Sequence, residues 1–206
     1  MRLHNILRSS SKKLLIGKGT VSTTSIFDNL IRCTVATIWP QLDWQLIKCQ
    51  IRQESDFRLD AISSCGAIGL MQILPETARD LGFTRDELFI PEKNLRAGIT
   101  YLYRQYYRLS EITNPVERIK FALASYNGGR GYINAALSLA RKSFGPWRNW
   151  NYTKAFLAHP GCNVNGKRPD YGQIIGYVDR IWSSYTGLPV KNEEVITAES
   201  TKRAGR

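Results

Sequence analysis

The stretch Ile51–Gln72 reads IRQESDFRLDAISSCGAIGLMQ, and it places an acidic residue, Glu54, inside an apolar helical pattern. An α-helix turns by about 100° per residue. Position 54 therefore falls within about 80° of three apolar side chains around the helix axis: Trp44, Ile47 and Ile51. This spacing puts the carboxylate on or beside the stripe that faces the core. Burial disfavours the charged form of a carboxyl group and raises its pKa, which suits it to general-acid catalysis.

The loop after Glu54 is built from small residues, which would let a bulky ligand approach the backbone. From these residues alone two interpretations stay open. Glu54 is either an acid in a cleft beside a ligand-binding loop, or a solvated glutamate paired with Arg52 or Arg58 ahead of a connecting turn. The small residues are Ser63, Ser64, Gly66, Ala67 and Gly69, and Leu70, Met71 and Gln72 follow them.

The composition is that of an ordinary globular chain with a strong positive charge. Its 206 residues are 43% hydrophobic and 22% charged, as in a folded domain with its own core. No apolar run approaches the roughly 20 residues needed to span a bilayer. Lys and Arg number 29 against 17 Asp and Glu, a net charge of +12 with a pI near 9.7. Such a surplus favours a polyanionic partner: nucleic acid, an anionic membrane or the acidic bacterial cell wall.

Cysteine and histidine are too few and too scattered to predict a metal site. No two cysteines have the Cys-x-x-Cys spacing of zinc ligands, and only two histidines are present. We therefore expect no metal and no cofactor, and reduced, mostly buried thiols. A bridge between Cys65 and Cys162 stays open. The other cysteines are Cys33 and Cys49, and the histidines are His4 and His159.

The middle of the chain reads as helices joined by turns that contain Gly and Pro. Asp43 is placed to cap a helix after Pro40, and residues 114–117 (NPVE) have a capping side chain, an N1 proline and an N3 glutamate in order. Convincing alternating strands are absent, so we predict a mainly α fold. Further helices are expected to begin at Pro75 and Pro91, the one after Asn114 to end near Gly128, and two more to cover Tyr132–Lys142 and Ile174–Ser184.

The two ends of the chain differ from its middle. Residues 1–26 carry five basic residues and no acid, and their early apolar run of three residues is too short for the core of a secretory signal. Residues 190–206 are polar and mixed in charge. We therefore expect a basic, flexible N-terminal tail, a single domain over residues 27–189, and a polar C-terminal tail.

Four blocks of residues together resemble the lytic transglycosylases that carry a soluble-lytic-transglycosylase catalytic domain. The first block is ESDFRLDAISSCGAIGLMQILPETA at 54–78, and the second is NLRAGITYL at 94–102. The third is ALASYNGG at 122–129, and the fourth is Tyr177-Val178. Gly98, inside the second block, costs a helix about 1 kcal/mol relative to Ala, so we interpret it as a position of close helix packing and leave it out of the site.

The resemblance implies a lysozyme-like fold of the goose type and a reaction that uses one carboxylate. Glu54 would protonate the oxygen between N-acetylmuramic acid and N-acetylglucosamine, then take a proton from the C6 hydroxyl of the muramoyl sugar, giving a 1,6-anhydro product. Tyr126 would hold Glu54, with Tyr177 nearby. The resemblance implies that Ser63, Met71, Gln72, Tyr126, Asn127 and Tyr177 bind the substrate, the glycan strands of peptidoglycan.

Other interpretations stay open. The chain resembles the family less well at Leu74, where Met is common, and at Gln173-Ile174, where Glu-Thr is common. A hydrolysing lysozyme of the goose type shares the fold, and a virion or cell-wall-binding module could keep it without catalysis. A second acid such as Asp170 or Asp179 could still assist Glu54, because most glycosidases use two carboxylates. Nucleic-acid binding depends only on the charge, and we do not expect it.

The segment at 146–178 is similar to an insertion of phage-encoded members of the family. Together with the missing secretory signal, this similarity suggests a phage lysis enzyme (endolysin) that reaches periplasmic peptidoglycan through holin pores, or a protein carried in a virion. We expect a monomer without stable membrane insertion.

Deleting residues 1–26 is expected to leave the melting temperature nearly unchanged. It should slow the cleavage of outer-membrane-permeabilised cells at low salt, because five positive charges raise the encounter rate with an anionic surface. The difference should shrink near 0.5 M salt, where screening acts within about 4–5 Å. A large fall in melting temperature with a salt-independent loss of activity would instead indicate that the segment docks on the domain around Ile26 and Phe27.

Overall fold

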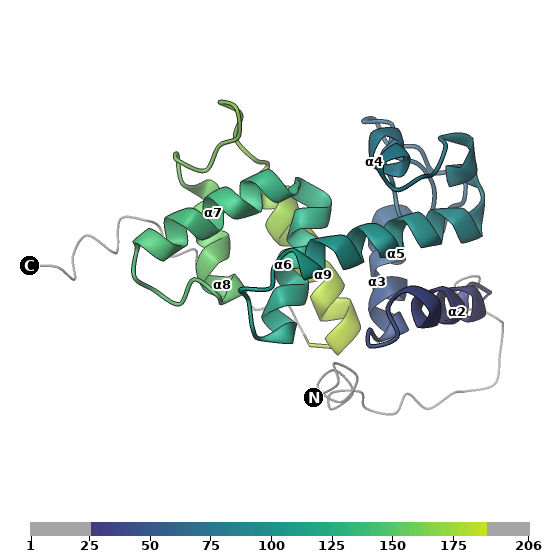
Figure 1. The fold of residues 1–206 in the computed structure, drawn as a ribbon, viewed down its shortest axis with the longest axis horizontal. Helices are drawn as coiled ribbons and strands as arrows, with labels where there is room; N and C mark the ends of the chain where they lie inside the picture. Colours follow the sequence, from purple (N-terminus) through teal and green to yellow (C-terminus); the bar gives the residue numbers. More distant parts are fainter. Residues whose placement is uncertain (1–25, 189–206) are drawn as a thin grey trace, which may run out of the picture. The chain divides into compact units, whose positions relative to one another are not determined.

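The computed structural model describes residues 26–188, whose regular elements are all helices (Figure 1). Within that range only three isolated β-bridges occur and no strand. The prediction of a mainly α fold is therefore confirmed. The α-helices are α2 (Asp28–Ile38), α3 (Trp44–Ser55), α4 (Pro75–Asp80), α5 (Pro91–Tyr107), α6 (Pro115–Gly128), α7 (Arg130–Lys142), α8 (Trp150–Thr153) and α9 (Tyr171–Thr186), and the 3-10 helices are η2 (Asp86–Phe89) and η3 (Lys154–Ala158).

The described residues fall into two compact units. The first unit contains residues 26–104 and 181–187, and the second contains residues 105–180 and Leu188, so the division falls within α5 and α9. The predicted tails lie outside the described residues, apart from Ile26 at the border. The single domain over 27–189 stays a prediction. No helix between residues 26 and 188 is long and apolar enough to cross a membrane.

Local caps set where the helices begin, as the sequence predicts. The Asp43 carboxylate accepts the N–H of Gln45 at 3.0 Å ahead of α3. Asn114 Oδ1 accepts the N–H groups of Val116 and Glu117 at 2.9 and 3.2 Å ahead of α6. Such caps satisfy amides that have no partner within the helix. The starts of α4 and α5 at prolines are confirmed too, whereas α7 and α9 begin two and three residues earlier than expected.

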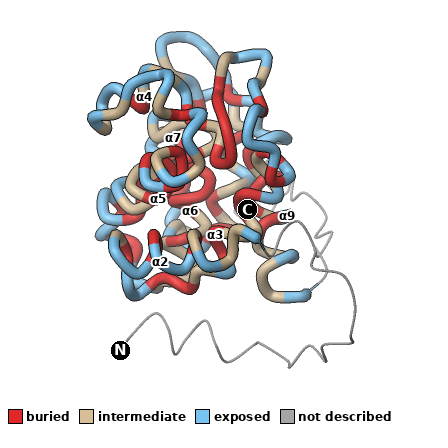
Figure 2. The backbone as a smooth tube through the Cα atoms, turned by 90° about the vertical axis from the view of Figure 1, so that its right-hand side faces the viewer, coloured by how far each residue is buried: buried red, intermediate tan, exposed pale blue. Residues whose placement is uncertain are grey.

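The buried face of α3 is shifted from the expected one. Trp44 is half-buried, with the guanidinium of Arg32 4.4 Å from its ring and the Lys48 ammonium 5.8 Å from it. Glu54 is half-buried and so lies beside the stripe. Figure 2 shows how buried and exposed stretches alternate along such helices. The buried residues of α3 are Leu46, Ile47, Gln50, Ile51 and Ser55.

Helix α2 was not predicted from the sequence, because polar residues interrupt its apolar pattern. It packs on α3 through Ile31 and Val35, which are buried, and through an ion pair of 2.6 Å between Asp28 and Lys48. Just before it, the ring of Phe27 stacks on Phe57 at 6.0 Å between centroids. Tertiary contacts thus stabilise a helix with weak local signals.

Gly98 lies where α5 meets the loop that follows α3. A Cβ at residue 98 would stand 2.4 Å from Met71 Sδ and 2.6 Å from Met71 Cβ. Met71 itself is fully buried. The interpretation of Gly98 as a position of close packing is therefore confirmed.

In the second unit α6, α7, α8 and η3 pack together. Phe121 of α6 meets the buried Trp150 of α8 edge-on, with the ring centroids 5.3 Å apart. At the end of α6, Gly128 leaves room for Ile174 of α9, whose Cδ1 would be 2.2 Å from a Cβ at residue 128. Ile174, which stands where the family commonly has Thr, thus fills the space beside Gly128.

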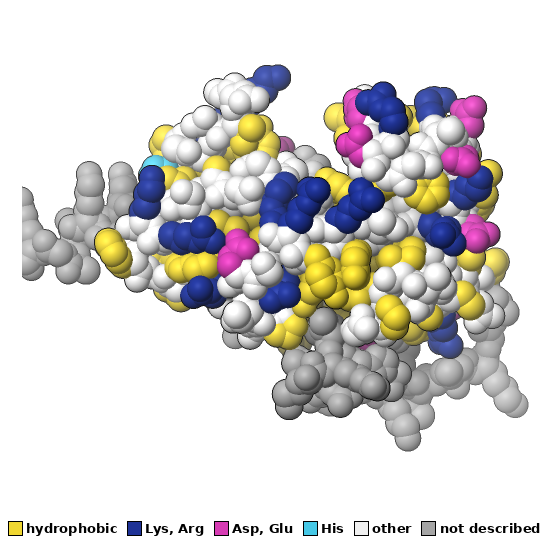
Figure 3. Space-filling model, viewed as in Figure 1, with side chains coloured by type: hydrophobic (Ala, Val, Ile, Leu, Met, Phe, Trp, Pro, Cys, Tyr) yellow, Lys and Arg dark blue, Asp and Glu magenta, His cyan; other side chains and the backbone are white. Residues whose placement is uncertain are grey.

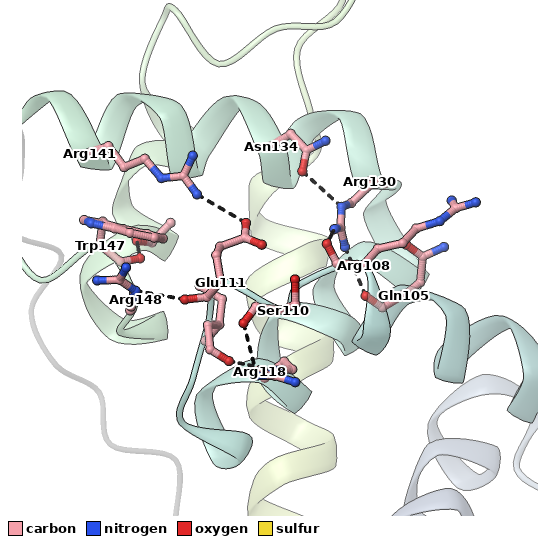
Figure 4. A network of polar contacts seen from close by, with 12 residues as sticks. Gln105, Arg108, Ser110, Glu111, Arg118, Arg130, Asn134, Arg141, Trp147 and Arg148 are labelled. Carbon is pink, nitrogen blue, oxygen red and sulfur yellow. Dashed lines mark hydrogen bonds and ion pairs between the residues drawn. The ribbon is translucent and has the colours of Figure 1, made fainter. Parts of the chain in front are cut away.

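Three arginines hold the turn that joins α5 to α6 (Figure 4). Arg130 donates to the main-chain carbonyls of Gln105 and Arg108. Arg118 donates to those of Ser110 and Ile112 at 3.2 and 2.5 Å. Arg148 Nε donates to the carbonyl of Glu111 at 2.9 Å. Carbonyls at a helix C-terminus lack partners and carry partial negative charge, so these three arginines stabilise the backbone of the turn.

Gly98→Ala is expected to lower the free energy of unfolding by about 1–3 kcal/mol, because the added methyl group overpacks the contact with Met71. The substitution would otherwise stabilise a helix by about 1 kcal/mol. Gly172→Ala in α9 is the matched control, since its Cβ would meet one atom at 3.6 Å. Urea unfolding of both variants measures the effect. Equal stabilisation by both would contradict close packing at Gly98.

Candidate active site around Glu54

Glu54 lies in the last turn of α3, directly before a sharp bend of the chain. The two residues after Ser55 have left-handed backbones, with φ of 48° at Asp56 and 64° at Phe57. This conformation costs a residue other than Gly roughly 1–2 kcal/mol. The stacking of Phe57, which is buried, on Phe27 helps to offset that cost. The bend fixes where the helix ends and hence the position of Glu54.

Ser55 ties the end of α3 to the small-residue loop. Its side chain is buried, and its hydroxyl donates to the carbonyl of Leu70 at 2.9 Å. On the other side of the bend, Arg58 Nε donates to the carbonyl of Ser55 at 3.2 Å. The guanidinium of Arg58 is thus directed at the main chain beside Glu54.

The Asn94 side chain of α5 holds the same loop from the opposite side. Its Oδ1 accepts the N–H of Met71 at 2.8 Å, and its Nδ2 donates to the carbonyls of Ile68 and Leu88 at 2.8 and 2.9 Å. The side chain is 1% exposed. A Cβ at Gly69, whose φ is +76°, would stand 2.4 Å from Asn94 Nδ2. Gly69 is therefore required by this contact, a reason internal to the protein rather than the approach of a ligand.

Ser63 and Gln72 each use part of their hydrogen-bonding capacity inside the loop. Ser63 Oγ accepts the N–H of Ala67 at 3.0 Å, which leaves its hydroxyl proton as a donor. Gln72 Nε2 donates to the carbonyls of Ala61 and Gly69 at 3.1 and 3.0 Å. The carbonyl oxygen of its side chain is the atom left to accept a bond from a ligand.

The other residues of this loop differ in how far their side chains are exposed to solvent. Met71 is 0% exposed and packs on Gly98, so its side chain supports the loop from the core side. Gly66 lies in an open turn, with nothing within 4 Å of a Cβ built there. Leu59 and Ile62 are exposed on the same loop, at 41% and 56%. The expected contact of Met71 with substrate stays a prediction.

The second unit contains the other three residues of the predicted site. Tyr126 and Asn127 lie in the last turn of α6, and Tyr177 lies on α9. Both tyrosines are buried, at 9% and 2% exposure. Asn127 Oδ1 is buried without a hydrogen-bond partner, a costly state that a donor from a ligand or water would relieve. The predicted bond between Tyr126 and Glu54 stays a prediction.

The two acids considered as partners of Glu54 have local roles in the second unit. Asp170 caps α9, since its carboxylate accepts the N–H of Gln173 at 2.9 Å. Asp179 pairs with Lys154 at 3.7 Å. Among residues 26–188 no group of three His, Cys, Asp or Glu side chains could hold a metal ion.

The cysteines differ from the expectation of mostly buried thiols. All four are free, with Cys33 and Cys65 exposed, Cys49 half-buried and Cys162 buried. Desolvation raises the pKa of the Cys49 and Cys162 thiols. The expectation was wrong for Cys33 and Cys65, which the periodicity of the chain gives no means of placing.

Comparison with known proteins identifies the family of the chain. The family model described as "Transglycosylase SLT domain" matches residues 35–147. A membrane-bound lytic murein transglycosylase F of Desulfosudis oleivorans is 34% identical over 154 residues, which are 72% of this chain and 34% of that protein. Its namesake in Alcanivorax borkumensis is 32% identical over 167 residues, 78% of this chain and 34% of that protein. The chain thus spans about a third of the length of these relatives.

Among solved structures, the chain is similar to the 70 kDa soluble lytic transglycosylase of Escherichia coli. The TM-score is 0.55 at 22% sequence identity, over 79% of this chain and 24% of that one. At this identity the likeness shows the fold alone. With the family match, it confirms the prediction of a lysozyme-like fold of the goose-type and soluble lytic transglycosylase kind.

Asn94→Ala is expected to lower the free energy of unfolding by about 2–4 kcal/mol, because it leaves the N–H of Met71 and the carbonyl of Leu88 without the partner that Asn94 provides. Asn29→Ala, at an exposed position of α2, is the matched control and should change it by less than about 0.5 kcal/mol. Urea unfolding followed by circular dichroism gives both values. Similar small effects for the two variants would contradict the role given to the Asn94 amide.

Proposed function

The chain belongs to the transglycosylase SLT domain family, and on that premise we propose that it cleaves peptidoglycan with Glu54 as its single catalytic carboxyl group. The bond would be the β-1,4 link between N-acetylmuramic acid and N-acetylglucosamine. The observation that carries the proposal is the position of Glu54, half-buried at the end of α3 beside a loop that Ser55 and Asn94 fix. A carboxyl group held in this way is pre-organised for proton transfer.

The reaction balances without water. Glu54 donates its proton to the bridging oxygen, which leaves with N-acetylglucosamine as a hydroxyl group. The resulting carboxylate takes the proton from the C6 hydroxyl of the muramoyl sugar, and that oxygen closes on C1. The product carries a 1,6-anhydro ring, and Glu54 returns to its protonated form. No metal or cofactor takes part in this scheme.

We propose that the groups with unused hydrogen-bonding capacity contact the sugars. Ser63 would donate from its hydroxyl, and Gln72 would accept at its side-chain carbonyl. The unpaired Oδ1 of Asn127 would accept an N–H of an acetamido group or a hydroxyl. Tyr126 would hold Glu54, with Tyr177 near it, while Met71 would support the wall from beneath. Peptidoglycan glycan strands are the proposed partner, with no nucleic acid, and the protein would act as a monomer.

The goose-type hydrolysing lysozyme remains the competing reaction on this fold. Mass spectrometry of the muropeptides released from purified sacculi separates the two, since an anhydro product is one water lighter than a hydrolysed one. Hydrolysed ends alone would overturn the proposed chemistry and leave Glu54 as a general acid. No cleavage by the folded chain would favour a non-catalytic wall-binding module.

We further propose that the chain is a phage lysis enzyme. The proposal rests on the similarity of the segment at 146–178 to an insertion of phage-encoded members of the family, and it includes release to the periplasm through holin pores. Expression in a bacterial host with and without a holin tests it. Lysis that depends on the holin supports release through pores, whereas lysis without the holin argues against it.

Glu54→Gln is expected to lower the rate of sacculus cleavage by at least 10²–10⁴-fold, because the amide cannot donate the proton. Asp56→Asn, two residues away at an exposed position with a left-handed backbone, is the matched control and should keep most activity. Turbidity clearing and product release measure the rates, and circular dichroism checks the fold. Activity near wild type in folded Glu54→Gln would remove Glu54 from the mechanism.

A further inference from the structure

The turn between α7 and α8 combines positive charge with aromatic rings. Residues 141–148 read RKSFGPWR, with three cations, two aromatic residues and no acid. Phe144 is 98% exposed, far more than any other large apolar side chain among residues 26–188. Its backbone has a φ of 59°, which is unusual for a bulky residue. The chain thus presents a phenyl ring to water in a conformation that is itself unfavourable.

The neighbours of Phe144 are anchored, so its exposure is built into the turn. Ser143 Oγ lies 2.7 Å from the hydroxyl oxygen of Tyr152, and a Cβ at Gly145 would stand 2.1 Å from the same ring. The N–H of Phe144 donates to Arg141, and that of Trp147 donates to Gly145, both at the main-chain carbonyl. With residues 143 and 145 both fixed on Tyr152, the side chain between them is directed outward.

The cations of this turn lie beside its second aromatic residue and at the end of α7. Arg141 and Arg148 stack on Trp147, with their guanidinium carbons 4.1 and 4.0 Å from its ring (Figure 4). Lys142 is exposed at the end of α7. The acid in contact with the group is Glu111, 3.2 Å from Arg141, so three cations face one carboxylate. Figure 3 shows more Lys and Arg than Asp and Glu side chains on this face of the second unit.

We propose that the turn at residues 141–148 binds the surface of an anionic phospholipid bilayer. Phe144 would enter the boundary between headgroups and acyl chains. Lys142 would contact lipid phosphates, together with those N–H groups of Arg141 and Arg148 that do not bind Glu111. Apolar side chains flanked by Lys and Arg bind membrane interfaces in this way, and each cation near an anionic leaflet adds affinity. A glycan strand or a nucleic-acid duplex would match the cations but would offer no apolar phase for the phenyl ring.

This surface is distinct from the catalytic group, and it would hold the enzyme beside the membrane while it cuts the wall. It contains none of the residues proposed to bind the substrate. Membrane binding can therefore fail without any effect on the proposed transglycosylase activity. Activity on isolated sacculi, which contain no lipid, should be the same for Phe144→Ser and the unaltered chain.

Vesicle sedimentation with the full chain tests the proposal. Vesicles that mix phosphatidylglycerol with phosphatidylcholine should bind the protein, and vesicles of phosphatidylcholine alone should bind it much less. Phe144→Ser should weaken binding to the mixed vesicles about tenfold, since the ring no longer leaves water. Lys142→Gln should weaken it about fivefold. In Phe144→Trp, the new indole should be quenched by brominated lipid.

Matched controls separate this turn from the general positive charge of the chain. Phe89→Ser removes a ring that is 37% exposed beside Arg85 in the first unit, and it should leave vesicle binding unchanged. Equal losses for Phe89→Ser and Phe144→Ser, or no loss for Phe144→Ser, would overturn the proposal. So would a Phe144→Ser defect in binding to sacculi or DNA with vesicle binding intact.

Discussion

The amide group of Asn94 is the contact on which the arrangement around Glu54 depends. The loop after α3 has no regular secondary structure, yet its residues 67–71 are buried, and buried N–H and C=O groups need partners. The amide of Asn94 donates two hydrogen bonds and accepts one, and these bonds hold two segments: the loop, at Ile68 and Met71, and η2, at Leu88. The contact is so close that residue 69 must lack a Cβ. A side chain of α5 thus makes hydrogen bonds with the loop that a neighbouring strand would make in a sheet.

The same reasoning changes how the small residues are understood. The size of the loop residues suggested that a ligand approaches the backbone, but Gly69 is small because Asn94 occupies the space beside it. Gly66, in an open turn, keeps the earlier interpretation. Closely packed and accessible residues therefore alternate along one loop. The buried residues fix its backbone, while Ser63 and Gln72 keep polar atoms that could form hydrogen bonds with a sugar.

The net charge is also partly structural. Arg118, Arg130 and Arg148 direct their guanidinium groups at main-chain carbonyls in the turn after α5, where a helix ends and carbonyls lack partners. Arginine suits this task because its planar group offers several fixed donors. A charge of +12 therefore overstates the positive surface that is available to a partner. What distinguishes the turn after α7 is the exposed ring of Phe144 among its cations, rather than the charge by itself.

The sequence alone determined the features that depend on neighbours within a few residues. The cap at Asp43, the start of α6 after Asn114 and the place of Glu54 beside a buried stripe were all predicted, because capping and helical periodicity act over one or two turns. Helix α2, the bonds of Ser55 and Asn94, the exposure of Cys65 and the outward ring of Phe144 were decided only by the tertiary structure. The helix and the two sets of bonds depend on residues 15 or more positions away in the chain, and the direction of the Phe144 ring depends on how its neighbours pack on Tyr152. Such packing leaves no local pattern to read in the sequence.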